Sequence, residues 1–194
     1  MEAKKLFLRI ISIGAAILII SGGYVINKAF TGNTKFEEEE VFVYVPTDSK
    51  YEDVKKILAP YIENQSKIDW VASKRDYDSN VKAGKFLLKK GMSSFSIVRA
   101  LRLNIPVKLA FNNQEKVQDL FVRIASQIEP DTTKLNEIFT NDTFLQENGL
   151  NKDNVMSFFI PNSYEFYWNI SPEEFAEKLT KEYKRFSKNC SRMF

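Results

Sequence analysis

The sequence contains no histidine and only one cysteine, Cys190, among its 194 residues. These absences exclude Ser-His-Asp and Cys-His catalysis and the usual zinc sites, which draw their ligands from His and Cys. A single cysteine cannot form an internal disulfide, so a hydrophobic core must stabilise the fold. Carboxylates, lysines, tyrosines and hydroxyls remain as acid-base candidates, and we expect no metal site.

The sequence also lacks a strong excess of charge. It has 28 basic and 25 acidic residues, a formal net charge of +3, and no basic stripe with interleaved aromatic residues. This balance argues against nucleic acid as a partner. The composition, 44% hydrophobic and 27% charged, is that of a folded protein. The length suits one medium domain or two small ones beside a membrane segment.

One long hydrophobic run is present near the N-terminus. No charge occurs from Ile10 to Ile26, and Lys4, Lys5 and Arg9 precede this run. With the apolar residues just before it, the run reaches the roughly 20 residues that a spanning helix needs. A cleaved signal peptide shares these features, but its apolar core is usually shorter, about 7–15 residues. We therefore expect residues 1–29 to form a cytoplasmic tip and an uncleaved transmembrane anchor.

The flanking charges predict the orientation of the anchor. Basic residues lie before the run, and the acidic sequence FEEEE, residues 36–40, follows it. The positive-inside rule places the N-terminus in the cytoplasm and the chain beyond about Lys28 outside the inner (cytoplasmic) membrane. Residues 30–40 are polar and are predicted to form an acidic stalk.

Residues 41–103 show the pattern of a β-α-α-β-α module. β-branched and aromatic residues predict a strand over 41–45, and apolar residues at helical spacing predict two helices after it. Gly84 and Gly91 bracket a second strand, and Ser93 or Ser94 begins a third helix.

Residues 104–194 predict the start of a mixed α/β domain. A strand at 106–111 leads into a helix that carries apolar residues on one face up to Ile128. A final helix begins at Ser171-Pro172-Glu173-Glu174, a capping box with proline at its first position. We predict that Phe175, Leu179, Tyr183 and Phe186 pack along this helix. The predicted fold class is thus α+β.

The sequence resembles the first half of the endolytic murein transglycosylases, and residues 41–103 are similar to a LysM-like peptidoglycan-binding module. The resemblance is carried by three segments: VKAGKFLLKKGMSSFSIVRAL (81–101), NNQEKVQDLFVRIASQIE (112–129) and FIPNSYEFYW (159–168). It implies a single N-terminal transmembrane helix, a LysM-like module and, over residues 104–194, part of a transglycosylase domain.

The resemblance also implies a reaction. Enzymes of this family cleave nascent glycan strands, as one glutamic acid protonates the glycosidic oxygen and the sugar's own 6-hydroxyl closes to give a 1,6-anhydro product. The implied partners are peptidoglycan glycan strands, cell-wall synthases and the inner membrane. An older family label, aminodeoxychorismate lyase-like, suggests pyridoxal phosphate, but no lysine stands out as a Schiff-base residue, and we expect no cofactor.

The position of the family's catalytic acid affects what the chain can do. In the family this glutamate lies in a later helix, beyond the segment that matches EYKRF, residues 182–186. We therefore expect it beyond Phe194, in which case the chain is a truncated or frame-shifted copy without the catalytic glutamate. The alternative is a non-catalytic, membrane-tethered module that binds peptidoglycan or a protein partner.

Glu165 is the candidate for a substitute acid within the sequence, because Tyr164 and Trp168 beside it could stack on sugar rings. The other interpretation, which we favour, makes it a solvated carboxylate on an aromatic turn anchored by Pro161.

Other polar clusters also have two interpretations. Glu37–Glu40 could bind a cation, but alternate residues of an extended chain point apart, which favours a solvated segment. Asn112 and Asn113 could contact sugar hydroxyls or cap a helix. A basic group could bind acidic peptide stems or belong to a half-exposed strand: Lys82, Lys85, Lys89 and Lys90. Trp70 is expected in the core.

Overall fold

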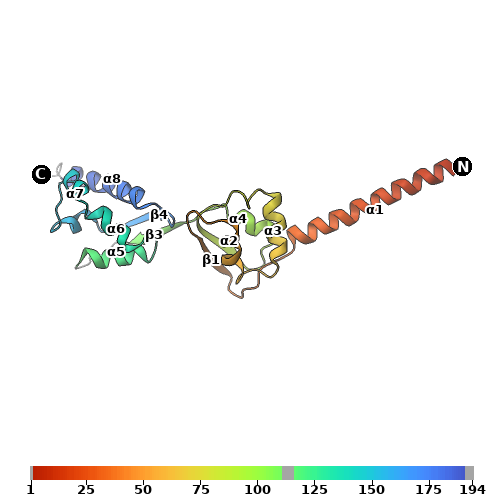
Figure 1. The fold of residues 1–194 in the computed structure, drawn as a ribbon, viewed down its shortest axis with the longest axis horizontal. Coiled ribbons are helices and arrows are strands. Elements are labelled where there is room, and N and C mark those ends of the chain that lie inside the picture. Colours follow the sequence, from red (N-terminus) through yellow and green to blue (C-terminus); the bar gives the residue numbers. More distant parts are fainter. Residues whose placement is uncertain (1, 111–115, 191–194) are drawn as a thin grey trace. The chain divides into compact units, whose positions relative to one another are not determined.

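The computed structural model describes residues 2–110 and 116–190 (Figure 1). The fold is α+β, with two separate two-stranded sheets. The chain divides into two compact units: a small unit of Met1–Lys82 and Phe86–Leu103, and a second unit of Ala83–Lys85 and Asn104–Phe194. Each unit is described separately below.

The small unit begins with a long helix, α1 (Glu2–Phe30). Its Ser12–Phe30 part is long and apolar enough to cross a membrane, and little of it is buried. The elements that follow are β1 (Glu40–Val45), α2 (Tyr51–Leu58), α3 (Gln65–Lys74), β2 (Gly84–Lys89) and α4 (Ser94–Ala100). This order matches the β-α-α-β-α pattern read from the sequence, and Ser93 caps α4 by accepting a hydrogen bond from the Ser96 backbone.

Strands β1 and β2 pair, and α2, α3 and α4 supply most of the remaining core, to which Ala29 of α1 and Tyr77 of the loop after α3 also contribute. The core side chains alternate along β2, where Phe86 and Leu88 are fully buried while Lys85 and Leu87 are only half-buried. Trp70 lies at the edge of this core, since it is half-buried and contacts Tyr24 of α1 edge to face.

Residues 30–36 differ from the stalk read from the sequence. Asn33 and Phe36 are buried, and Thr34 forms an isolated bridge with Ile62. The segment packs because the side chain and backbone of Asn33 find partners within the small unit. Glu37–Glu40 are exposed, as a solvated segment requires.

The second unit contains β3 (Pro106–Ala110), α5 (Val117–Ala125), α6 (Thr132–Phe139), α7 (Asp142–Glu147), a 3₁₀ turn (Val155–Phe158), β4 (Ser163–Tyr167) and α8 (Pro172–Cys190). Strands β3 and β4 pair in antiparallel register. The helices cover a core rich in phenylalanine, in which Phe139 of α6 makes ring contacts with Phe121, Phe158 and Phe175.

Helix α8 begins at the predicted capping box, where the Ser171 hydroxyl accepts a hydrogen bond from the Glu174 backbone at 3.1 Å. Phe175 and Leu179 are buried on its inner face. The prediction that Phe186 packs in the same row is wrong, since 52% of its surface is exposed.

Candidate functional site

The aromatic stretch that includes Glu165 forms a strand and not the turn read from the sequence. In β4 the side chains alternate, so that Tyr164 and Phe166 are buried whereas Glu165 and Tyr167 are exposed. The backbone of β4 pairs with β3, and Glu165 lies opposite Lys108. The alternation, and not a turn anchored by Pro161, determines where the carboxylate points.

The surroundings of Glu165 do not resemble those of a general acid. Such a carboxyl needs a partly apolar groove that keeps it protonated. Glu165 is exposed and has a cation opposite it on β3. The Lys178 ammonium donates a hydrogen bond to the Glu165 backbone carbonyl and lies 4.6 Å from the centre of the Phe166 ring.

A small hollow is lined in part by Tyr164. The Tyr164 hydroxyl donates a hydrogen bond to the Ile160 carbonyl at 3.1 Å. Burial raises the pKa of Tyr164, and the nearby Glu182 carboxylate raises it further. The hollow has a volume of about 120 Å³ and is lined by Ile160, Asn162, Tyr164, Glu182, Arg185 and Phe186. That volume is well below the roughly 300–1,000 Å³ of most ligand sites, so it does not suit a glycan strand.

Two of the four lysines that the sequence singled out pair with two of the glutamates within the small unit. Lys90 Nζ lies 2.9 Å from a Glu37 carboxylate oxygen, and Lys89 Nζ lies 2.7 Å from Glu40. The hydrogen bond from Lys90 lowers the pKa of Glu37. Lys82 is exposed and Lys85 is half-buried.

The described residues contain no cluster of His, Cys, Asp or Glu that could hold a metal ion. Asn112 and Asn113 lie outside the described residues.

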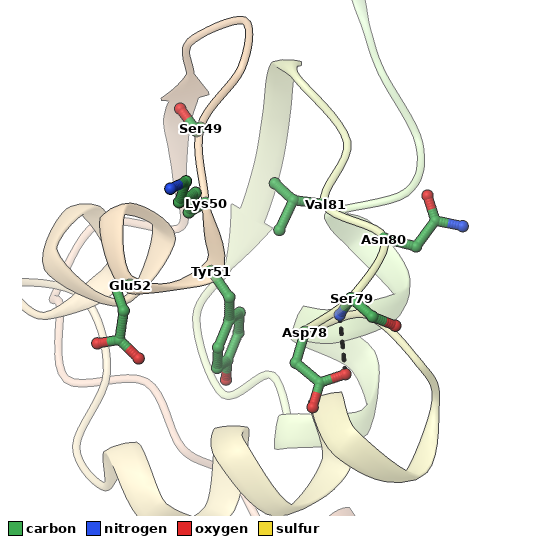
Figure 2. A pocket seen from close by; sticks show the side chains of 8 residues that line it. All are labelled: Ser49, Lys50, Tyr51, Glu52, Asp78, Ser79, Asn80 and Val81. Carbon is green, nitrogen blue, oxygen red and sulfur yellow. Dashed lines mark hydrogen bonds between the residues drawn. The ribbon is translucent and has the colours of Figure 1, made fainter.

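A larger groove lies in the small unit, between two loops that are far apart in the sequence (Figure 2). One wall is the turn into α2, and the other is the loop from α3 to β2. The groove has a volume of about 530 Å³. Its lining residues are Ser49, Lys50, Tyr51, Glu52, Asp78, Ser79, Asn80 and Val81.

Tyr51 gives the groove a fixed aromatic wall. Its hydroxyl donates a hydrogen bond of 2.8 Å to Asp69, which also accepts one of 2.8 Å from Gln65. The ring packs edge to face on Tyr77, 6.2 Å between centroids, and the Lys55 ammonium lies 5.5 Å from its centre. Burial, followed by the bond to Asp69, raises the pKa of Tyr51 far above its usual value. The ring is therefore held neutral and in one orientation.

The opposite wall of the groove is polar and short-chained. Asp78, Ser79 and Asn80 are all exposed, and the Ser79 backbone donates a hydrogen bond to its neighbour Asp78 at 2.9 Å. In Figure 2 the Asp78 and Val81 side chains lie across the groove from the Tyr51 ring. One aromatic face with hydroxyl, amide and carboxylate groups around it suits a ligand rich in hydroxyls and amides. The sequence analysis missed this site.

Comparison with solved structures finds a YceG-like protein from Listeria monocytogenes, with 19% sequence identity and a TM-score of 0.39. The match covers 81% of this chain and 60% of the other, so the chain spans less than two thirds of that protein's length. The comparison with curated proteins gave no match. Residues 43–193 match the model of the YceG-like family. Because this match covers both units after α1, the chain belongs to the YceG-like family, the family of the endolytic murein transglycosylases.

Proposed function

We propose that this protein acts at the membrane in endolytic transglycosylation of peptidoglycan, and that its described part anchors the chain and binds glycan strands. The family match over residues 43–193 is the observation that supports this proposal. The proton donor of the reaction is then a residue other than Glu165. Its position beyond Phe194 stays a prediction from the resemblance.

The groove of the small unit is the proposed glycan site. Peptidoglycan sugars combine flat apolar ring faces with acetamido and hydroxyl groups. The fixed Tyr51 ring offers a surface for a sugar face, and Ser79 and Asn80 offer hydrogen-bond partners for the polar groups. A volume of about 530 Å³ lies within the range of about 300–1,000 Å³ that ligand sites usually have.

The chemistry of the reaction explains why Glu165 is not the proposed general acid. A glycosidic oxygen is a weak base, so its acid must remain protonated near neutral pH and must reach the oxygen within about 3 Å. The described carboxyl groups with clear pKa changes, Glu37 and Glu177, shift in the opposite direction because Lys90 and Lys181 donate hydrogen bonds to them.

Helix α1 is the proposed anchor. The span Ser12–Phe30 has the length and apolar character of a membrane-crossing helix. With the basic N-terminus in the cytoplasm, both units face the extracytoplasmic side, where nascent glycan strands are found.

Glycan binding is tested with the full chain in detergent micelles, co-sedimented with purified peptidoglycan. The double variant Ser79→Ala/Asn80→Ala should bind at least about tenfold more weakly, which corresponds to the loss of about 1.4 kcal/mol of polar contacts. The matched control Glu63→Gln/Ser66→Ala changes two exposed residues outside the groove and should bind like the wild type. Equal binding by both variants and the wild type would contradict the groove assignment.

The role of Glu165 is tested with uncrosslinked glycan strands and detection of 1,6-anhydro ends by mass spectrometry. Glu165→Gln should leave binding and any anhydro product unchanged. Products that form with the wild type and disappear with Glu165→Gln would make Glu165 the acid. Binding without products from either protein would agree with an acid beyond Phe194 and equally with the non-catalytic binding module, and it would leave Glu165 a solvated carboxylate.

A further inference from the structure

Helix α1 joins the folded part of the small unit with no spacer between them. Ala29, in the last turn of the helix, is already buried in the core of the unit. The Thr31 hydroxyl donates a hydrogen bond to the Asn27 carbonyl at 2.6 Å and accepts one from the Lys67 ammonium of α3 at 2.9 Å. The end of α1 is thus bonded to α3 within one residue of its last turn.

Asn33 fixes this junction. Its amide nitrogen donates to the Asn64 carbonyl at 2.9 Å and to the Ser94 hydroxyl at 3.0 Å, and its amide oxygen accepts from the Asn64 backbone at 2.8 Å. Its own backbone bonds to Met92 at 2.8 Å and to Glu63 at 3.1 Å. A buried amide with all these partners resists displacement, because each lost bond leaves a polar group without a partner.

Aromatic rings of the small unit lie against the last two turns of α1. Trp70 of α3 contacts Tyr24 at 6.5 Å between ring centroids, and Phe95 of α4 contacts Phe30 at 5.2 Å. The apolar run of the sequence ends at Ile26, two residues before the next charge, Lys28. At a rise of about 1.5 Å per residue, Tyr24 lies about 3 Å below this end and Phe30 about 6 Å above it. The headgroup layer on each side of a bilayer is about 5–8 Å thick. When α1 spans with Ile26 at the edge of the hydrocarbon, Trp70 therefore contacts the helix just inside this edge and Phe95 contacts it within the headgroup layer.

Basic side chains surround these rings. Lys28 lies 5.3 Å from the centre of the Tyr24 ring, and the Arg75 guanidinium lies 5.1 Å from the centre of the Phe95 ring. Lys74 of α3 and Arg99 of α4 are exposed, and neither forms a salt bridge within residues 2–110 and 116–190. Lys67, Trp70 and Lys74 follow at helical spacing on one face of α3.

Acidic residues near this face are few. Asp69 of α3 accepts hydrogen bonds from Tyr51 and Gln65 on the groove side of the helix. Asp76 follows the C-terminus of α3 and is exposed. Glu63 lies just before α3 and is also exposed. Five cations, Lys28, Lys67, Lys74, Arg75 and Arg99, thus outweigh two exposed carboxylates, Asp76 and Glu63. Aromatic rings combined with Lys and Arg are the side chains that favour a membrane interface.

We propose that α3 and α4 dock on anionic lipid headgroups of the leaflet from which α1 emerges, with Trp70 inserted at the interface and the surrounding cations on the phosphates. This docking rests on the proposed function, because it requires α1 to span the membrane. It converts the fixed junction at Asn33 into a fixed height of the small unit above the bilayer.

The test uses the full chain in vesicles and the fluorescence of Trp70. Trp168→Phe removes the other tryptophan, and brominated lipids report contact by quenching. In vesicles with phosphatidylglycerol, lipids brominated near the headgroup end of the acyl chain should quench Trp70 at least twofold more than in vesicles of phosphatidylcholine alone. Raising the salt to about 0.5 M should reduce the difference, since it screens exposed charges.

Charge variants test whether basic side chains hold the small unit on the lipid headgroups or whether Trp70 is merely close to them. Lys74→Gln/Arg99→Gln should lower the quenching at least twofold in phosphatidylglycerol vesicles. The control Lys56→Gln/Lys82→Gln removes the same charge from exposed residues of α2 and of the loop before β2, and it should behave like the wild type. Quenching that is equal in both lipids, or equal in the two double variants, would overturn the proposal.

Carbonate extraction of the same vesicles checks the anchor separately. A chain that stays in the membrane but shows no lipid-dependent quenching would contradict docking. It would not affect the proposals of the membrane anchor and of the glycan groove. A chain that carbonate removes would contradict both the anchor and docking, while peptidoglycan co-sedimentation in micelles would still report on the groove.

Discussion

Tyr51 both lines the groove of the small unit and affects the stability of that unit. Its ring forms the groove wall, whereas its hydroxyl bonds to Asp69 beneath that wall. A half-buried phenol that donates to a carboxylate favours the protonated form, because ionisation would place two negative charges side by side. The same contact that orients the ring therefore makes folding sensitive to alkaline pH.

The pH dependence of unfolding should show this contact. The ordinary pKa of tyrosine is about 10, so above pH 10 the unfolded chain loses the Tyr51 proton while the folded chain keeps it. Stability is then complete below pH 10 and falls as pH rises, by at most about 1 kcal/mol in total after allowance for solvent screening. Urea unfolding at pH 9 and pH 11 should show a larger loss for the wild type than for Tyr51→Phe.

Two other tyrosines, Tyr77 and Tyr44, help to interpret this measurement. Burial raises the pKa of Tyr77 to about 12, so Tyr51→Phe should retain part of the alkaline loss. The control Tyr44→Phe, on the exposed side of β1, should follow the wild-type curve. Equal losses for the wild type and Tyr51→Phe would show that the bond to Asp69 does not hold the proton.

At the scale of elements, β4 shows how a strand is positioned by a partner distant in the sequence. Its exposed positions face solvent beside those of β3, and Lys108 lies opposite Glu165 in the register. Opposite charges facing each other across two strands contribute about 0.2–1 kcal/mol. This register can be tested without changing the core.

A double-mutant cycle tests the charge pair of Lys108 and Glu165. Lys108→Glu places two carboxylates opposite each other and should lower the free energy of unfolding by about 0.2–1 kcal/mol. The swap Lys108→Glu/Glu165→Lys should recover most of the loss in chemical denaturation. Lys134→Glu on α6 serves as a control that should not couple to Glu165. Coupling that is absent at low salt would mean that the register is different.

A substitution at Gly84, the first residue of β2, tests the backbone conformation at the start of that strand. Its φ is +141°, and a Cβ built there would lie 2.4 Å from the Asn104 amide. That amide accepts a hydrogen bond from the Lys85 backbone at 3.0 Å and donates one to Asn169 at 2.9 Å. Gly84→Ala should therefore destabilise the chain by about 1–3 kcal/mol. Gly91→Ala is the informative control, because it has a positive φ but no neighbour within 4 Å, and it should cost less.

The elements that the sequence revealed are those with local signals. Strand β2 has apolar alternation between two glycines, and α8 begins with a complete capping box. Strand β4 has alternation too, in SYEFY, but the preceding proline and asparagine favour a turn, and its partner β3 lies more than fifty residues earlier. A search of aromatic segments for residues that alternate between apolar and polar would have found β4.

The packed segment before β1 had no such signal. Residues 31–35 are polar in sequence, and Asn33 is buried because its partners are Asn64, Met92 and Ser94, all distant along the chain. The groove was missed for the same reason, since Tyr51 at the start of α2 and Asn80 in the loop before β2 are far apart in the sequence. Sequence patterns identify elements, whereas both of these features arise from how the elements meet.

At the scale of the whole molecule, the two units have separate hydrophobic cores. Phe86 lies in the core of the small unit and Phe139 in that of the second unit, and both are fully buried. Each unit also contains one tryptophan, Trp70 or Trp168. The chain thus carries one natural reporter of unfolding for each core.

Core truncations should therefore act on one unit at a time. Phe86→Ala and Phe139→Ala each leave a large cavity and should cost about 3–5 kcal/mol in the unit that contains them. In a Trp168→Phe background, Trp70 fluorescence should report a lower unfolding midpoint for Phe86→Ala and an unchanged one for Phe139→Ala. In a Trp70→Phe background, Trp168 should show the reverse. If both truncations moved both reporters equally, the two cores would unfold as one cooperative structure, and a change in either unit would alter the stability of the groove in the small unit.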